Sequence, residues 1–194
     1  SELAFLRKAA DMGNREAQYT LGQMISNLDD EETREFRLKL MMKLYRCASE
    51  QGQGNASYWL GMFLPDYHKY DEAVRAYHQG VKNGNYLSAF ILSNAFKAGK
   101  EKGNNDFLDV ETDEERARRY GIIDSYLSTY DFMSPTVPDL DDIVPLPPAP
   151  LPEWDGKIAF QRWVEGNEPP KPSDELIKKL ADKAGLDVKT GLPL

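Results

Sequence analysis

Small and large apolar residues recur in a fixed order around three glycines in the first half of the chain, Gly13, Gly52 and Gly84. Counted from each glycine, a small residue stands at position +4, an aromatic at +6, a leucine at +8 and another small residue at +9. Upstream, a small residue occupies position −4 and a large one position −7. The glycines lie 39 and 32 residues apart, a period typical of helical repeats. We therefore predict three helix hairpins that stack on one another.

Each of these glycines has a physical reason for its position. Glycine accepts the left-handed backbone conformation that closes a helix, so each is expected to end the first helix of its hairpin. The second helices then begin near Glu16, Ala56 and Leu87. The small residue at +9, Gly22 in the first unit, lets two helix backbones approach closely, at a cost of roughly 1 kcal/mol against alanine. The aromatic and leucine positions are expected to fill the seam between hairpins.

One more helix is predicted after the third hairpin. Thr112–Glu115 reads TDEE, a capping box in which a hydroxyl and a carboxylate satisfy the free amides of a helix start. Apolar residues follow at helical spacing, namely Ala117, Tyr120, Ile123 and Leu127. Because this unit lacks the hairpin glycine, we interpret it as a capping helix that completes a helical domain over residues 1–130.

The pattern changes in the second domain, residues 131–194. Seven prolines fall within residues 135–152 and exclude a regular helix or central strand there. Such a composition also suits a flexible linker or a docking segment. The large apolar residues of this segment are Val137, Leu140, Ile143, Val144, Leu146, Leu151 and Trp154. Because disordered linkers carry few such residues, we predict an extended arm packed on the repeats, followed by short helices.

The last of these helices has clear boundaries in the sequence. In SDELIKKLADKAG, Ser173 is a suitable N-cap and Gly185 a suitable closing residue. Acidic residues stand at its start and lysines toward its end, as the helix dipole favours. The fold class predicted for the whole chain is therefore all-α.

Composition and charge narrow the function. The chain has 194 residues, 41% of them hydrophobic and 29% charged, which is ordinary for a globular protein. The net charge of −8 argues against nucleic acid as a partner. The first hundred residues carry +1 and the remainder −9, so the acidity belongs to the second half. The chain begins at Ser1 without Met, which we interpret as a processed or shortened chain, with room for an upstream N-terminal signal or lipid anchor.

No constellation of catalytic residues stands out, and we expect neither an enzyme nor a bound cofactor or metal. His68 and His78 are the two histidines, and Cys47 is the single cysteine. Two separated histidines do not make a zinc site, and no serine stands in a nucleophile elbow. Cys47 is interpreted as a small packing residue, and His78 is expected to be partly exposed on a helix face.

Binding to another protein remains as the possible function, and eight residues are the candidates for contact with the partner. Tyr67, His68 and Tyr70 form an aromatic patch in a loop between repeats. Asp139, Asp141, Asp142 and Asp155 belong to the acidic arm, where they would steer a basic partner more than add affinity. Trp154 would anchor either the partner or the arm itself.

The repeat AFLRKAADMGNREAQYTLG closely resembles the Sel1-like repeat, a relative of the tetratricopeptide repeat, and the resemblance covers about residues 2–99. It implies a right-handed α-solenoid. The tail, with IVPLPPAPLPEWDG and the closing GLDVKTGLPL, resembles the C-terminal region behind Sel1-like repeats in a group of bacterial proteins, over roughly residues 112–194. Several of that group are immunity proteins against effectors of the type VI secretion system, phospholipases included.

The resemblance implies a non-catalytic immunity protein that binds and neutralises a cognate toxin, a phospholipase effector, in the periplasm. A general Sel1-like scaffold or regulator in the bacterial envelope is the alternative. A toxin gene beside the coding gene would favour the immunity protein, and an isolated or regulatory locus would favour the scaffold.

Overall fold

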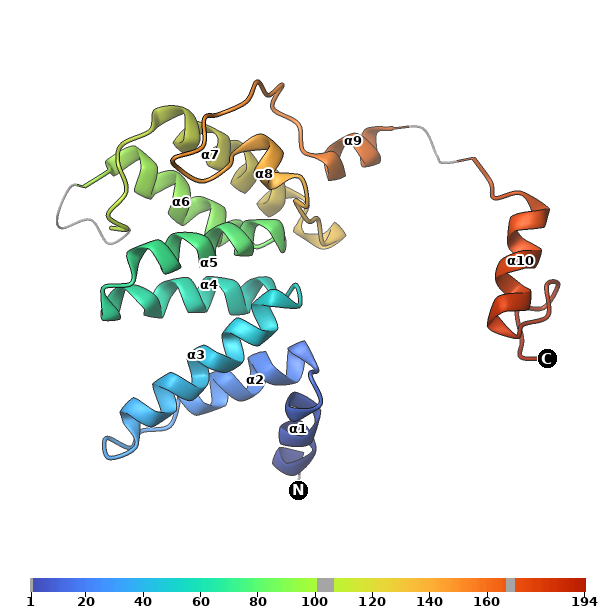
Figure 1. Cartoon of the computed structure of the whole chain (residues 1–194), viewed down its shortest axis with the longest axis horizontal. Coiled ribbons are helices and arrows are strands. Elements are labelled where there is room, and N and C mark those ends of the chain that lie inside the picture. Colours follow the sequence, from blue (N-terminus) through green and yellow to red (C-terminus); the bar gives the residue numbers. More distant parts are fainter. Residues whose placement is uncertain (1, 101–106, 167–169) are drawn as a thin grey trace. The chain divides into compact units, whose positions relative to one another are not determined.

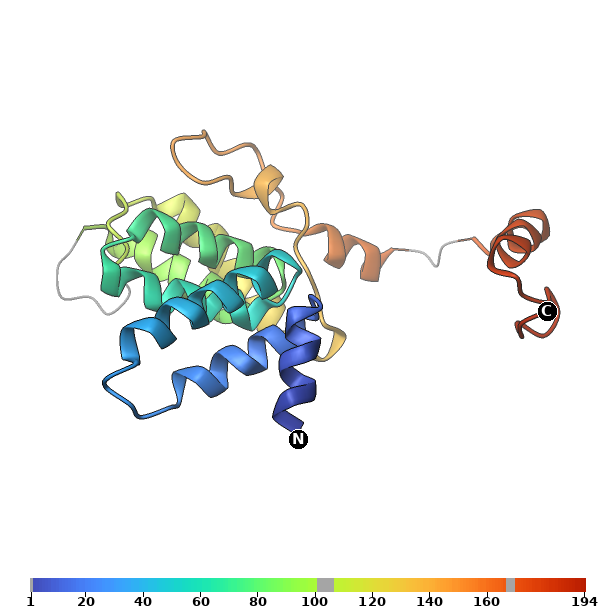
Figure 2. The ribbon, with the colours of Figure 1, turned by 60° about the horizontal axis from the view of Figure 1, so that its bottom comes forward.

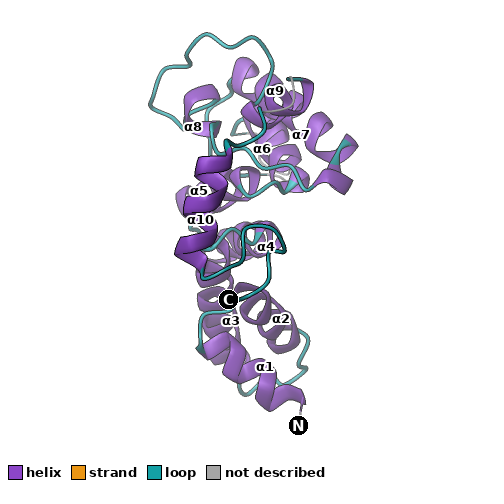
Figure 3. Cartoon of the chain, turned by 90° about the vertical axis from the view of Figure 1, so that its right-hand side faces the viewer, coloured by secondary structure: helices purple, strands orange, loops and turns teal. Residues whose placement is uncertain are grey.

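The computed structural model describes residues 2–100, 107–166 and 170–194 (Figure 1). The chain divides into two compact units, residues 1–162 and residues 163–194. The described residues form helices and loops without a strand, as Figure 3 shows, so the all-α prediction is confirmed.

The first unit contains most of the helices. These are α1 (Glu2–Asp11), α2 (Arg15–Ser26), α3 (Arg34–Glu50), α4 (Gly54–Phe63), α5 (Tyr70–Lys82), α6 (Tyr86–Ala98), α7 (Glu114–Thr129) and the one-turn α8 (Leu140–Ile143). Two 3₁₀ turns, η1 (Leu64–Tyr67) and η2 (Asp131–Met133), follow α4 and α7, and α9 (Ala159–Glu165) runs across the division between the units.

The first six helices form pairs joined by short turns: α1 with α2, α3 with α4, and α5 with α6. The second helix of each pair also packs on the next first helix, so α2 contacts α3, α4 contacts α5, and α6 contacts α7 (Figure 2). The predicted hairpins are therefore present. The handedness and the repeat family stay predictions.

The hairpin turns have the backbone that the sequence pattern predicts. Gly13, Gly52 and Gly84 have φ angles of +90°, +93° and +86°, in the region that favours glycine. One residue after Gly13 and Gly84, the Asn14 and Asn85 side chains accept hydrogen bonds from the first turn of the following helix, at 2.9 and 2.8 Å. Each turn thus closes one helix and starts the next.

The small residues inside the second helices make room for tyrosines. A Cβ added to Gly22 would stand 2.5 Å from a ring carbon of Tyr45, and one added to Gly61 would stand 2.8 Å from Tyr77. The predicted close approach at Gly22 is confirmed. Leu92 is buried at its seam position, but Phe90 is 47% exposed, so the expectation that every aromatic at +6 fills a seam is wrong for the third unit.

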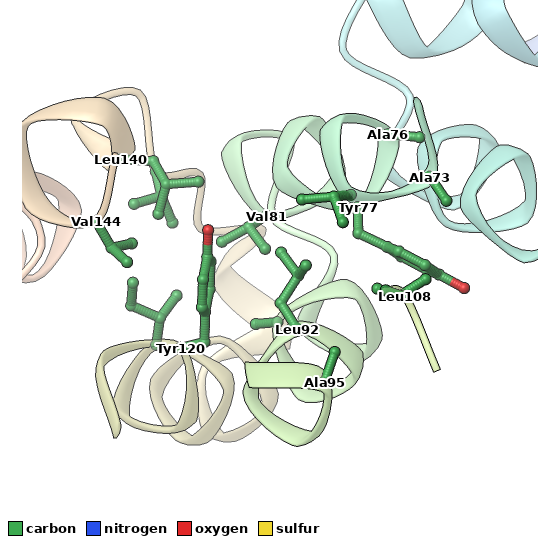
Figure 4. Packing of buried hydrophobic residues seen from close by; sticks show 14 of the residues in the cluster. Ala73, Ala76, Tyr77, Val81, Leu92, Ala95, Leu108, Tyr120, Leu140 and Val144 are labelled. Atoms are coloured by element: carbon green, nitrogen blue, oxygen red, sulfur yellow. The ribbon is translucent and has the colours of Figure 1, made fainter. Parts of the chain in front are cut away.

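One hydrophobic core runs from α3 to α7 and includes side chains of the proline-rich arm. The fully or almost fully buried residues of the arm are Val137, Leu140, Ile143, Val144 and Ile158. Figure 4 shows the Tyr120 ring of α7 with Leu140 and Val144 of the arm on one side and Val81 and Leu92 on the other. Burial of each aliphatic side chain contributes about 1.5–3 kcal/mol, which explains why the arm from residue 131 to residue 162 lies in the first unit.

Two local expectations need correction. The N-cap of α7 is Asp113 and not Thr112, because the Asp113 carboxylate accepts the Arg116 N–H at 2.9 Å. The arm also contains the one-turn helix α8, although a regular helix was not expected there. This turn fits because the stretch between Pro138 and Pro145 has no proline, so its amides are free to bond.

The second unit is built around α10 (Asp174–Ala184). The Ser173 hydroxyl oxygen accepts the Leu176 N–H at 3.2 Å, and Gly185 closes the helix with φ of +66°, as the sequence predicts. An isolated β-bridge joins Leu186 and Pro193, which follow α10 in the sequence. The packing of residues 163–194 on the repeats stays a prediction.

Candidate partner-binding surface

The arm lies on α5 and α7, and its backbone is fixed there by hydrogen bonds. At its start, the Val137 N–H donates to the Lys82 carbonyl at the end of α5, at 3.0 Å. The turn at Gly84 lies against the same segment, because a Cβ on Gly84 would stand 2.1 Å from the Pro135 carbonyl oxygen. The arm is thus seated on the third hairpin at its first residues.

Two buried arginines of α7, Arg116 and Arg119, hold the rest of the arm. Their guanidinium groups donate to the backbone carbonyl oxygens of Ile143, Pro145, Ala149 and Pro152. Proline has no N–H, so a proline-rich segment cannot pair its carbonyls by itself and needs outside donors. A guanidinium with five N–H donors is well suited to supply them.

The charge of Arg119 is balanced by a carboxylate of its own helix, and that of Arg116 by the N-cap Asp113. Arg119 Nε lies 2.8 Å from Glu115, and Arg118 also donates to that carboxylate at 2.7 Å. These hydrogen bonds, from Arg118 first and Arg119 next, lower the pKa of Glu115 to about 2. Arg119 also lies over the Trp154 ring, with its guanidinium carbon 5.8 Å from the ring centroid. The arginine therefore joins α7, the arm backbone and the arm tryptophan.

His78 connects the arm to α5 and α7 and is buried, with 5% of its surface exposed. The expectation of a partly exposed His78 is therefore wrong, because the arm covers it. Its Nε2 lies 2.7 Å from Asp141 of the arm, and its Nδ1 lies 2.8 Å from the Tyr120 hydroxyl. Since a carboxylate only accepts, Nε2 carries the proton, and Nδ1 of the neutral ring accepts from Tyr120. Lys82 Nζ donates to the other Asp141 oxygen.

Burial and charge set the protonation of this cluster. Burial lowers the pKa of His78, although Asp141 acts in the opposite direction. For Asp141, burial raises the pKa, but the hydrogen bonds from Lys82 and His78 outweigh it and leave the pKa below its usual value. At neutral pH the cluster is therefore a neutral histidine between a tyrosine hydroxyl and a charged carboxylate.

Of the other three aspartates predicted to contact a partner, two are bonded within the chain and one is exposed. Asp139 Oδ2 accepts the Ala159 N–H at 2.8 Å, and its Oδ1 is buried without a partner in the part of the chain described. Asp155 accepts from Arg162 at 2.6 Å, and this hydrogen bond lowers the pKa of Asp155. The Asp142 carboxylate is exposed and pairs with none of the described residues. Of the four candidate aspartates, Asp142 is the most open to a partner.

Trp154 is half-buried and packs against the core. Its Nε1 donates to the Lys157 carbonyl at 2.8 Å, which closes a turn within the arm. Together with the Arg119 contact, this makes Trp154 an anchor of the arm. A contact between Trp154 and a partner stays a prediction.

The aromatic patch lies around η1, between α4 and α5. Tyr67 is exposed at the end of η1, and His68 follows with φ of +57°. The His68 and Tyr70 rings contact each other at 6.2 Å between centroids, and Tyr70 also packs edge-on against Phe107 at 5.3 Å. Tyr70 is therefore tied to the fold, whereas Tyr67 and His68 are accessible.

Arg116, Arg119 and the buried His78 were not found by the sequence reasoning. A signal did exist for the arginines: Arg116 and Arg119 are one helical turn apart on a helix with a buried apolar face. A proline-rich arm packed on that face needs donors for its carbonyls, and these arginines are the donors.

The described residues contain no group of three or more His, Cys, Asp or Glu side chains placed to hold a metal ion. None of the helices in the described part is both long and apolar enough to cross a membrane. The arm is fastened across α5 and α7 of the helical stack by the contacts described above.

Residues 88–194, which include α7, the arm and the second unit, match the family model described as Domain of unknown function (DUF6396). The chain belongs to the DUF6396 family. No curated protein matches this member of the family.

Solved structures from Pseudomonas aeruginosa are similar to this DUF6396 chain. Immunity protein Pa5087 is 29% identical with a TM-score of 0.59, and the match covers 75% of this chain and 52% of that one. PA5086 is also 29% identical, with a TM-score of 0.58 and the same coverage. Immunity protein PA5088, at 23% identity and a TM-score of 0.51, covers 87% of this chain and 52% of its own, and supports the fold alone. The chain thus spans about half the length of each.

Proposed function

We propose that this chain is a non-catalytic immunity protein that binds a cognate antibacterial toxin and neutralises it. The observation that carries the proposal is the similarity to immunity protein Pa5087, 29% identical over 75% of this chain. Inhibition by binding needs a shaped and stable surface and no reacting groups. A stack of helix pairs with a fastened arm provides such a surface.

The proposal extends to the kind of toxin and its place of action. We take the toxin to be a phospholipase effector of a type VI secretion system, met in the periplasm. Its support is the resemblance of residues 112–194 to the region behind Sel1-like repeats in immunity proteins. We also propose a right-handed solenoid of Sel1-like hairpins. The positive φ angles of Gly13, Gly52 and Gly84 support the repeated hairpin turns, and the resemblance to the Sel1-like repeat supports the handedness.

Of the candidate aspartates, Asp142 is the one that we expect to attract a basic partner. Asp139, Asp141 and Asp155 are used within the chain, whereas Asp142 is exposed on α8. Tyr67 and His68 provide a second accessible position for contact. An exposed carboxylate increases the rate of association with a basic partner more than it strengthens the complex.

A competition experiment tests the proposed function. A strain that lacks the gene is grown against its toxin-delivering siblings, with and without the chain supplied in trans, and the tagged chain is used to recover its partner. We expect the chain to restore survival and to recover a phospholipase that it inhibits in a purified assay. Unchanged survival of the deletion strain, with no toxin recovered, would favour an envelope scaffold instead.

A further inference from the structure

An open apolar groove lies between α1 and α3, with α2 as its floor. It has a volume of about 520 Å³. Its apolar lining consists of Leu3, Ala4, Leu21, Ile25, Phe36, Leu40 and Leu44. Leu3 is 52% exposed and Phe36 is 69% exposed, so both remain accessible at its walls. A groove of this kind is the default place to look for a binding partner.

The charged groups at the rim of the groove are already paired. Arg7 and Asp11, one turn apart on α1, form an ion pair at 3.0 Å. Arg37 of α3 donates to the carbonyl oxygens of Ile25 and Leu28, at 3.1 and 2.6 Å. The groove is therefore suited to apolar side chains and not to a strongly charged ligand.

The same groove occurs again two hairpins later, and there a segment of the chain itself occupies part of it. In the glycine register, Leu3, Arg7 and Asp11 of α1 correspond to Val74, His78 and Lys82 of α5. Likewise, the floor residues Leu21 and Ile25 of α2 correspond to Leu92 and Phe96 of α6. In both places the wall opposite is the next helix along the chain, α3 in the first groove and α7 in the later one.

The occupant of the later groove is the arm of the chain itself. Its Asp141 bonds to His78 and Lys82, and its Leu146 and Pro147 line, together with Val74 and Phe96, a cavity of about 410 Å³ that remains beside the arm. Leu140, Ile143 and Val144 of the arm are buried there. The groove between one first helix and the next thus accepts a short segment with two or three aliphatic side chains close together.

Between these two grooves, the middle one is bridged by an ion pair. Arg46 of α3 lies 2.9 Å from Glu72 of α5. Arg46 corresponds to Arg7 and His78 in the glycine register. Among the described residues, the first groove is thus the position in which this repeat geometry recurs without the arm and without an ion pair between its walls.

We propose that the groove between α1 and α3 binds a short aliphatic segment of the cognate toxin, in the way that the equivalent groove binds the arm. This inference rests on the proposed function and assigns the surface that performs it. A second copy of the chain is a weaker occupant, because two copies with a net charge of −8 each repel one another.

The substitution Phe36→Asp tests this surface, with Phe132→Asp as a matched control. Both residues are exposed phenylalanines, Phe132 at 81%, and both changes add one negative charge, but Phe132 lies in η2 outside the groove. The affinity of each variant is measured for the toxin recovered with the unaltered chain, and each is scored for protection of the deletion strain. Circular dichroism and thermal melting confirm that the variants fold.

We expect Phe36→Asp to weaken toxin binding at least tenfold and to reduce protection, with Phe132→Asp within twofold of the unaltered chain. Leu3→Asp should act like Phe36→Asp, whereas Phe36→Leu should retain binding because it keeps the wall apolar. Equal affinities for Phe36→Asp and Phe132→Asp would overturn the inference while the proposed function stands.

Self-association is measured on the same proteins by sedimentation. If the unaltered chain forms dimers, Phe36→Asp dissociates them, and toxin binding is unchanged, the groove is a contact between copies and the inference is wrong. If the unaltered chain neither protects the deletion strain nor binds a toxin, the proposed function fails, and the inference fails with it.

Discussion

Replacing Gly84 by alanine tests whether the arm is seated on the turn between α5 and α6. Gly84 has φ of +86°, and a Cβ there would stand 2.1 Å from the Pro135 carbonyl oxygen. A backbone atom that close forces either the turn or the arm to move. Gly52 holds the same place in the preceding hairpin with φ of +93°, but its added Cβ would meet only the end of the Arg15 side chain, at 3.0 Å. That side chain can rotate away.

The size of the effect follows from these two geometries. Both substitutions place an alanine in left-handed backbone, which costs about 1–2 kcal/mol. Displacing the backbone of the arm adds about 1–3 kcal/mol, the range found for overpacked interiors. We expect the free energy of unfolding to fall by about 1–2 kcal/mol for Gly52→Ala and about 2–5 kcal/mol for Gly84→Ala. At about 2–4 °C per kcal/mol, Gly84→Ala should melt roughly 2–12 °C below Gly52→Ala.

Urea unfolding followed by circular dichroism, together with calorimetry, measures both quantities. Gly13→Ala is a second control, because its added Cβ has no atom within 4 Å and its φ is +90°. It should resemble Gly52→Ala. If Gly84→Ala loses no more stability than these two controls, the arm does not press on the turn and the reasoning is refuted.

Three further predictions concern the contacts that hold the arm. Arg119→Ala removes the donors to two arm carbonyls and should lower the free energy of unfolding, measured in urea, by about 2–4 kcal/mol. Proteolysis within the arm should become faster, and an unchanged urea midpoint would contradict this prediction. Asp141→Ala leaves the buried Nε2–H of His78 without an acceptor and should lower the free energy of unfolding by about 1–3 kcal/mol. Asp142→Ala, on the same turn, should change it by less than about 0.5 kcal/mol, and equal losses for the two variants would count against the assigned role of Asp141. Burial holds the pKa of His78 below its ordinary value of 6.5, so the unfolded chain binds this proton more tightly and the free energy of unfolding should fall as the pH drops below about 6.5. His78→Gln should show a smaller fall between about pH 7 and pH 5 by urea titration, and identical profiles would argue that His78 is not the titrating group.

The repeat architecture is the part of the fold that the sequence reveals most directly. A turn that requires positive φ favours glycine at that one position, whatever residues surround it. Gly13, Gly52 and Gly84 stand at such turns. In the same way, the close approach of the Tyr45 ring requires a small residue at position 22, where the sequence has Gly22. These requirements are local or recur with the repeat, so they can be recognised without knowledge of the partner helix.

The candidate site is less predictable, because its contacts join distant residues. His78 reads as a surface residue on its own helix, and only the arm 63 residues later covers it. The arm aspartates read as an acidic contact surface, but Asp139, Asp141 and Asp155 are bonded within the chain. The number and type of charged residues can be read from the sequence, whereas the partner of each charged side chain depends on which helices the arm packs against.

The sequence by itself determined the helix pairs, the positions of their turns, the apolar character of the arm and the boundaries of the terminal helix. The tertiary structure decided that Arg116 and Arg119 hold the arm, that the arm occupies part of the later groove and that the groove between α1 and α3 is open. The physical reason is the range of the interactions. Helix periodicity and glycine conformation act over a few residues, while carbonyl–guanidinium bonds and groove filling depend on segments that meet only after the chain has folded.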